Sequence, residues 1–318
     1  MKNKPTKIDG QATIKIFLTF FIFYILVCMI INPAKYISKS LEGISAWAFN
    51  VLPSVLPFMF FTRVLSSLDT LSKITKPLSF STTKIFKTPP VSAYIFLMAI
   101  LSGYPVGTKL VSDQFLQGKI TKEDAFKMTS FCSTSGPMFI IGAVGVGMFK
   151  NVKIGYILFF SHILGAIING IFFRGFRLKN NEKIDFGSKN YTKTDISDIV
   201  LDSTLSILCV GTIITIFFLI IETLLPIFDV FPKPISALLQ GLVEITKGSK
   251  SLSVLGAKKL STVLCSFVVS FGGISTLIQS ITMLSKLHMP VMLFAVQKMM
   301  HGLFSCIITF LLLLIFKL

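Results

Sequence analysis

Uninterrupted apolar runs constrain the fold of this chain more than any other feature of its sequence. Residues 154–173 and 291–316 are mostly aliphatic or aromatic, and roughly 20 such residues in a helix cross the hydrocarbon core of a bilayer. Of the 318 residues, 53% are hydrophobic and only 14% are charged, whereas an ordinary soluble domain carries about 25% charged residues. The sequence therefore predicts an all-α polytopic integral membrane protein.

The charged residues lie between the apolar runs, and most of them are lysines. The chain has 31 Lys and Arg against 14 Asp and Glu, which gives a net charge of +17. Lysine-rich loops at 69–90 and 174–194 are both expected on the cytoplasmic side, facing anionic lipid. Because no single segment gathers these charges, a nucleic-acid-binding module is excluded. The five isolated Cys residues predict neither a disulfide framework nor a metal site.

Several segments predict complete membrane spans. The basic N-terminus at 1–15 is expected in the cytoplasm, ahead of a first span at 16–31. The segment 36–50 has apolar residues at helical spacing, which is equally typical of a helix lying in the membrane interface and of a linker helix. Further spans are expected at 51–68, which Pro residues interrupt early, and at 154–173, 203–225 and 291–316.

Three other apolar runs are only about half as long as a bilayer requires. They cover 91–101, 138–149 and 260–270, and each adjoins a break rich in Gly, Pro or Ser, at 103–107, 133–137 and 271–273. Lipid cannot satisfy the backbone groups freed at such a break, so the break must be buried in protein or line a wet cavity. Both Lys-rich loops can be cytoplasmic if 91–118 is re-entrant. The sequence thus predicts about 7–10 membrane helices, broken and re-entrant half-helices included.

An internal similarity relates two of these breaks. Segment 102–108 resembles segment 270–276, which lies 168 residues later. The two segments match in a Ser, a branched apolar residue, a small residue and a Thr. Paired interrupted segments in corresponding halves are typical of a transporter binding site. We therefore predict a single membrane domain over 1–318 with two weakly related halves, at 40–173 and 199–318, joined by a basic cytoplasmic loop at 174–198.

Polar residues and glycines at the breaks form the predicted substrate-binding site. Glu244 is its strongest member, because ionisable groups within membrane segments usually mark function, although a solvated interfacial carboxylate remains an alternative. Glycines at the breaks equally fit close helix packing. Glu222, near the end of a span, is expected to reach outward, and His162 is expected to be a core residue. The predicted set is Gly103, Tyr104, Pro105, Gly107, Thr108, Lys109, Ser133, Ser135, Pro137, Glu244, Thr246, Gly272, Gly273, Ser275 and Gln279.

Two blocks of sequence carry a resemblance to a known family. They are Ser-Gly-Tyr-Pro-Val-Gly-Thr-Lys-Leu at 102–110 and the stretch 130–144 around Ser-Thr-Ser-Gly-Pro, and the segments 52–58, 161–165, 244–248 and 272–279 fit as well. Together they resemble the sporulation integral membrane protein family of YlbJ type, within the wider nucleoside-recognition (Gate) domain group. Gly136 stands where that pattern has Asn, so this position supplies no side-chain amide. The resemblance implies two Gate-like halves and a role in endospore formation, specifically in making the spore cortex, in a mother-cell or forespore membrane.

Three functions remain open on this basis. The first is a transporter-like core that moves or senses an unidentified small solute or cell-wall precursor. The second is a scaffold that recruits cortex-building enzymes, with loop 174–198 as the docking surface and other sporulation membrane proteins as partners. The third is an intramembrane enzyme acting on a lipid-linked precursor, with Glu244 as the base. Since the sequence lacks nucleotide-binding, nucleophile and metal-ligand motifs, we expect no enzymatic activity and no cofactor.

Overall fold

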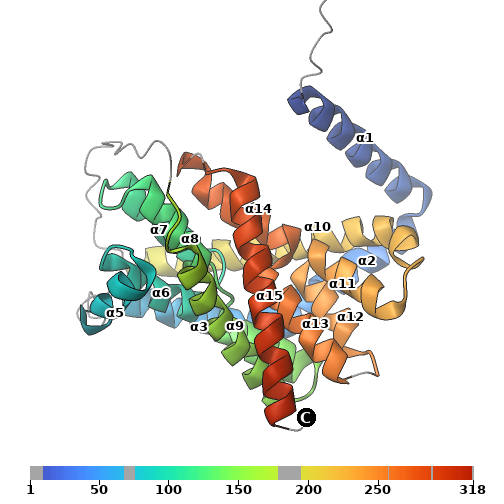
Figure 1. Ribbon diagram of the computed structural model, residues 1–318. Coiled ribbons are helices and arrows are strands. Elements are labelled where there is room, and N and C mark those ends of the chain that lie inside the picture. Colours follow the sequence, from blue (N-terminus) through green and yellow to red (C-terminus); the bar gives the residue numbers. More distant parts are fainter. Residues whose placement is uncertain (1–9, 68–75, 178–194, 257, 288, 317–318) are drawn as a thin grey trace, which may run out of the picture.

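The computed structural model describes residues 10–67, 76–177, 195–256, 258–287 and 289–316, and every regular element in these ranges is a helix (Figure 1). The first half contains α1 (Gly10–Ile31), α2 (Pro33–Ala46), η1 (Trp47–Val51), α3 (Leu52–Ser67), α5 (Lys76–Phe86), α6 (Val91–Ser102), α7 (Val106–Leu116), α8 (Lys122–Cys132), η2 (Met138–Met148) and α9 (Val152–Phe173). The second half contains α10 (Ile196–Phe228), α11 (Lys233–Val243), α12 (Ile245–Ser253), α13 (Lys258–Phe271), α14 (Gly273–Leu284), η3 (Ser285–Leu287) and α15 (Val291–Ile315).

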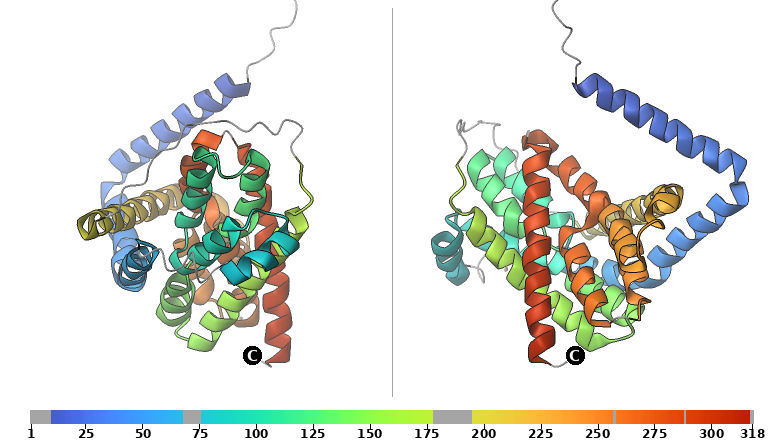
Figure 2. Two further views of the ribbon diagram at one scale, coloured as in Figure 1. Left: turned by 90° about the vertical axis from the view of Figure 1, so that its left-hand side faces the viewer. Right: turned by 45° about the vertical axis from the view of Figure 1, so that its right-hand side comes forward.

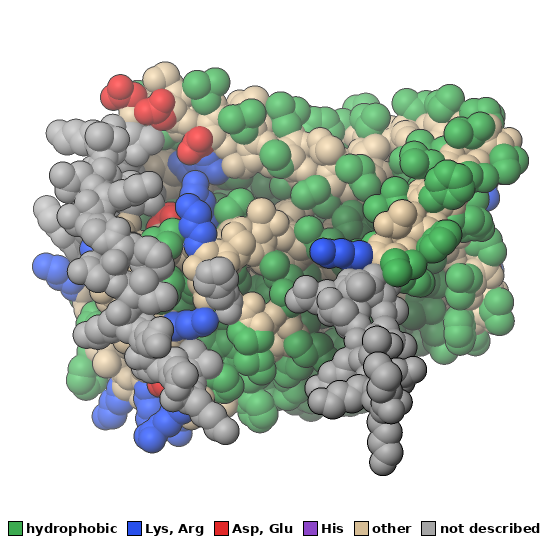
Figure 3. Space-filling view, turned by 90° about the horizontal axis from the view of Figure 1, so that it is seen from above, with side chains coloured by type: hydrophobic (Ala, Val, Ile, Leu, Met, Phe, Trp, Pro, Cys, Tyr) green, Lys and Arg blue, Asp and Glu red, His purple; other side chains and the backbone are tan. Residues whose placement is uncertain are grey.

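Five helical segments of the described residues are long and apolar enough to cross a membrane. They are Pro33–Leu65, Val152–Phe173, Ile196–Phe228, Lys258–Leu287 and Val291–Ile315. Large apolar side chains on their outer faces are exposed, for example Phe160 on α9 and Leu205 on α10, and apolar side chains cover much of the face seen in Figure 3. Such a surface is stable in contact with lipid but not with water. The predicted polytopic, all-helical membrane fold is confirmed.

Helix α1 projects away from the rest of the molecule (Figures 1 and 2). It contains the predicted first span at 16–31, and its apolar part, Lys15–Ile31, is shorter than the five segments above. Its apolar side chains are largely exposed; Phe17 and Phe20 are examples. Residues 1–9 of the predicted cytoplasmic N-terminus lie outside the described residues, as do 68–75 and 178–194 of the two Lys-rich loops.

The prediction of a separate helix at 36–50 followed by a span from 51 is wrong. Helices α2, η1 and α3 form one continuous helical segment, with a wide π turn at Trp47–Val51. The Pro residues that were expected to interrupt the span lie within this segment: Pro53 follows the wide π turn, and Pro57 lies inside α3. Side chains on either side of the turn bond back to the same helix. The Asn50 amide donates to the Ala46 carbonyl oxygen at 3.3 Å, and the Ser54 hydroxyl donates to the Asn50 carbonyl oxygen at 2.7 Å.

Helix α10 packs along α2 and α3 and extends beyond the predicted span at 203–225 at both ends. The indole of Trp47 lies against Gly211 and donates to the Ile207 carbonyl oxygen at 3.1 Å. Glu222 of α10 is buried and forms ion pairs with Lys35 and Lys39 of α2, at 2.9 and 3.5 Å. The expectation that Glu222 reaches outward is therefore wrong: two lysines of α2 neutralise it in place.

The order of elements repeats. A pair of short helices (α6–α7), a broken helix (α8–η2) and a long helix (α9) are followed later by α11–α12, α13–α14 and α15. Helix α9 starts at Val152 and α15 at Val291, 139 residues later, and His162 and His301 have the same separation. In this repeat, the break at 103–105 is equivalent to the break at Glu244, and the break at 133–137 is equivalent to the break at Gly272. It replaces the pairing of 102–108 with 270–276, whose similarity follows from their shared Ser and Gly content.

Helices α9 and α15 pack closely at Gly165, where a Cβ atom would lie 2.2 Å from the Ser305 hydroxyl oxygen. We expect Gly165→Ala to destabilise the purified protein by about 1–3 kcal/mol through overpacking. Ser305→Ala removes the obstructing oxygen, which has no hydrogen-bond partner among the described residues, so it should restore most of the loss. Thermal unfolding of both single variants and the double variant tests this contact. Additive destabilisation in the double variant would contradict it.

Candidate functional site

Two breaks in the first half end helices at positions where the chain turns. Helix α6 ends at Ser102, and Gly103 follows with φ +73°, a conformation that glycine adopts at low cost. Helix α8 ends at Cys132, and residues 133–136 run as irregular backbone before Pro137 and η2. The two breaks touch, because a Cβ atom on Gly103 would lie only 2.5 Å from the Gly136 backbone nitrogen. Glycine is therefore required at 103 both for its φ angle and for this contact.

The second half repeats this arrangement. Glu244 has extended backbone between α11 and α12, and Gly272 adopts a left-handed conformation between α13 and α14. A Cβ atom on Gly273 would lie 3.0 Å from the Gly241 carbonyl oxygen and 3.2 Å from the Val243 carbonyl oxygen. In each half, therefore, the break within the short-helix pair lies against the break within the broken helix. Helices α6 and α7 also pack on each other, as expected for a re-entrant segment at 91–118.

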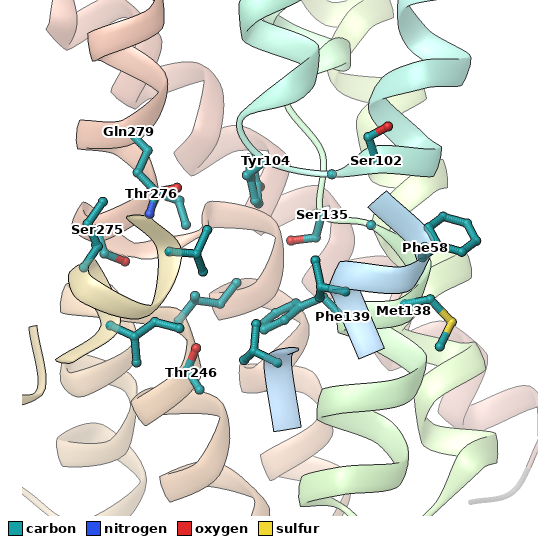
Figure 4. A pocket seen from close by; sticks show the side chains of 18 of the residues that line it. Phe58, Ser102, Tyr104, Ser135, Met138, Phe139, Thr246, Ser275, Thr276 and Gln279 are labelled. Atoms are coloured by element: carbon teal, nitrogen blue, oxygen red, sulfur yellow. The ribbon is translucent and has the colours of Figure 1, made fainter. Parts of the chain in front are cut away.

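Residues from three of the breaks, and from the first turn of α14 after the fourth, line one pocket of about 680 Å³ including its mouth (Figure 4). The predicted residues that line it are Gly103, Tyr104, Ser135, Glu244, Thr246, Ser275 and Gln279. Further lining side chains are mostly apolar and include Val51, Val55, Phe58, Met138, Phe139, Val210, Ile213 and Ile214. Figure 4 places Ser135, Thr246 and Ser275 around the same space, although they lie at or beside three different breaks. Polar side chains from several breaks thus share one pocket whose lining is mostly apolar.

The carboxylate of Glu244 is the principal charged group of this pocket. Its side chain is 1% exposed, and its Oε2 atom accepts a hydrogen bond from the Lys247 backbone N–H at 2.6 Å, which caps the start of α12. Its Oε1 atom has no hydrogen-bond partner among the described residues, and the same holds for the hydroxyls of Thr246 and Ser275. Buried polar atoms normally have partners. These three atoms are thus available to a ligand.

Sequence reasoning missed Lys298, which lies behind the pocket wall in α15. It is 2% exposed, and its ammonium donates to the Ser133 carbonyl oxygen at 2.7 Å and to the Tyr104 hydroxyl. It therefore satisfies a carbonyl freed at the end of α8 and fixes a side chain that lines the pocket. A signal was present, because Lys298 is the single Lys, Arg, Asp or Glu of the apolar run 291–315, and such residues are by default functional candidates.

Two histidines from equivalent positions of the repeat meet beside this lysine. The rings of His162 and His301 have centroids 4.6 Å apart. The Nε2 atom of His162 accepts from the Ser135 backbone N–H at 2.9 Å, so its Nδ1 atom carries the proton and donates to the Ser270 hydroxyl at 2.8 Å. His301 donates from Nε2 to the His162 carbonyl oxygen. His162 is thus a buried residue that holds the breaks of both halves in place.

The remaining predicted residues do not line the pocket. Lys109 is exposed on α7, the Thr108 hydroxyl donates to the Pro105 carbonyl oxygen, and Gly107 packs against the Cys132 backbone. The others outside the lining are Pro105, Ser133, Pro137, Gly272 and Gly273, which form the breaks themselves. The glycines at 142, 145 and 147 of η2 contact α3, α9 and η1, respectively.

Comparison with known proteins gives one significant match. The chain is 27% identical over 330 aligned positions to the sporulation integral membrane protein YlbJ of Bacillus subtilis (strain 168), covering 92% of this chain and 81% of that protein. No family model matches, so membership of the wider nucleoside-recognition group stays a prediction. No solved structure matches either. The predicted resemblance is nevertheless confirmed: this chain is a homologue of YlbJ, a sporulation integral membrane protein.

Proposed function

We propose that this protein acts in endospore formation, in spore cortex assembly, by transporting a small polar solute across a mother-cell or forespore membrane. The observation that carries this proposal is the convergence of three helix breaks, and of the first turn of α14 after the fourth, on one pocket with unpaired polar atoms. Broken helices at such a site are typical of secondary transporters, where half-helix ends and freed backbone groups contact the substrate. The sporulation role is supported by the name of the relative.

The repeat suggests how access to the pocket would change. Each half supplies one short-helix pair and one broken helix, and the two sets face each other across the pocket. Helices α9 and α15 pack against each other beside it. Rocking of one half against the other would open the pocket first to one side of the membrane and then to the other, as in transporters built from repeats. In this account the polar groups of the pocket bind the solute in both states.

The scaffold alternative is less well supported by these observations. A scaffold requires a docking surface, for which the basic loop 174–198 remains the candidate, but it has no use for buried unpaired oxygens such as those of Thr246 and Ser275. Leaving a buried polar group without a partner costs about 1–3 kcal/mol. A binding function offsets that cost, whereas docking through a loop does not.

Accessibility of the pocket to water distinguishes transport from scaffolding. In a variant without the five native cysteines, we expect Ser275→Cys to react with a small water-soluble thiol reagent in native membranes. The matched control is Ser280→Cys, one turn further along α14, which is equally buried but does not line the pocket. It should stay unmodified. Equal protection of both cysteines from reagent added to either side would contradict the proposed function.

A further inference from the structure

We propose that Glu244, Thr246 and Ser275 form a binding site for a monovalent cation of the Na⁺ type. The three side chains line the same pocket, are each at least 99% buried, and each has an oxygen without a hydrogen-bond partner among the described residues. Glu244 and Thr246 lie at the break between α11 and α12, and Ser275 lies in the first turn of α14. The role of this cation in driving transport rests on the proposed function; its binding does not.

Glu244 forms no direct ion pair in the described part of the chain. The nearest lysine in sequence, Lys247, directs its ammonium to Glu42 at 2.7 Å instead. Lys298 is engaged by Tyr104 and Ser133. A buried carboxyl group without a paired counter-charge is neutralised either by a bound cation or by a proton. The unpartnered hydroxyls of Thr246 and Ser275 in the same pocket favour the cation.

The type of donor selects the type of cation. All available donors are oxygens, which bind hard cations and are poor ligands for softer metals that prefer His or Cys. The described residues contain no cluster of three or more His, Cys, Asp or Glu side chains able to hold a metal ion. One carboxylate balances a single positive charge, which favours a monovalent ion over Ca²⁺ or Mg²⁺.

The backbone around Glu244 favours a cation as well. The carbonyls of Gly241 and Val243 lie in the last turn of α11, at the contact with Gly273, and carbonyls at a helix C-terminus carry partial negative charge. The positive N-terminus of α12 is occupied by the Oε2 atom of Glu244, which accepts from Lys247 N–H. The other oxygen, Oε1, has no hydrogen-bond donor among the described residues.

The test measures thermal unfolding of the full-length protein in detergent while NaCl replaces N-methyl-D-glucamine chloride at constant ionic strength. We expect Na⁺ to raise the midpoint of unfolding in a saturable way, because an ion that binds only the folded state stabilises it. Glu244→Gln should abolish the shift. Ser275→Ala should weaken the apparent Na⁺ affinity by about tenfold, and Ser280→Ala should leave it unchanged. Equilibrium binding of ²²Na⁺ gives a second readout for any variant that unfolds early.

Three results would overturn the cation site. They are no shift with Na⁺, K⁺ or Li⁺; a shift with Ca²⁺ alone; and a stability that responds to pH but to none of these ions. If Na⁺ does not bind while Ser275→Cys remains accessible from water, the cation site fails and the proposed transport function stands. If Na⁺ binds while the pocket is inaccessible from both sides of the membrane, transport fails and the cation site stands as a structural one.

Discussion

Replacing Lys298 with Met is expected to leave the protein in the membrane but to reduce the titre of heat-resistant spores, because a loss of about 1.4 kcal/mol at the pocket weakens binding there by about tenfold. Met keeps the volume of the side chain but removes the donor to the Ser133 carbonyl and the Tyr104 hydroxyl. An unpaired buried acceptor costs about 1–3 kcal/mol, and avoiding the burial of an ammonium offsets part of that cost. Abundance should therefore change little, whereas Tyr104 loses one of the two hydrogen bonds that hold its hydroxyl in the pocket wall and keeps the one to the Ser270 carbonyl oxygen.

Lys109→Met provides the matched control for this prediction. Lys109 follows the same break as Tyr104 but is exposed on α7, so its replacement should not affect sporulation. Spore titres after heating, read beside membrane abundance for both variants, decide the outcome. Full rescue by Lys298→Met would mean that Lys298 only fills space behind the pocket.

The complete spans were predictable because their signal is compositional. About 20 consecutive apolar residues specify a membrane helix almost regardless of context, and α9 and α15 begin and end within two residues of their predicted positions. The joined helix α2–η1–α3 was not predictable in this way. Pro53 and Pro57 are strong signals for an interruption, and only the structure reveals that the helix continues through both of them after a π turn at Trp47–Val51.

The candidate site was predictable where glycine and proline mark the breaks. Gly103 and Gly272 occupy positive φ angles, so the conformational need and the sequence signal coincide. The break at Glu244 has no such mark, since an extended backbone suits any residue. It is visible only through its carboxylate, which caps α12 by accepting from a backbone N–H three residues later. Two helices, α11 and α12, therefore meet at Glu244 without a glycine or proline to mark the break.

The convergence of the breaks depends on contacts far apart in sequence. The His162 ring joins Ser135 to Ser270, and Tyr104 reaches Lys298 across most of the chain. No local pattern predicts such pairs. The order of elements offers one clue, because a separation of 139 residues relates the starts of α9 and α15.

Replacing Glu244 with Gln is expected to abolish the function of the protein in sporulation. The amide is nearly the same size as the carboxylate, so α12 keeps a side-chain oxygen that can accept from Lys247 N–H. The charge, however, disappears from the centre of the pocket. Loss of one charge-assisted contact in a buried site costs about 1.5–3 kcal/mol, which corresponds to a binding constant lower by about tenfold to a hundredfold. Loss of the ion or solute bound there should then stop the cycle of transport.

The most direct measurement is the titre of heat-resistant spores in a deletion strain that expresses either wild-type protein, Glu244→Gln or Glu222→Gln, with equal membrane abundance verified. Glu222 is a buried carboxylate outside the pocket, paired with Lys35 and Lys39. The deletion strain should be defective, wild type and Glu222→Gln should restore heat resistance, and Glu244→Gln should behave as the deletion. Full restoration by Glu244→Gln at normal abundance would contradict the assignment of this pocket as the functional site.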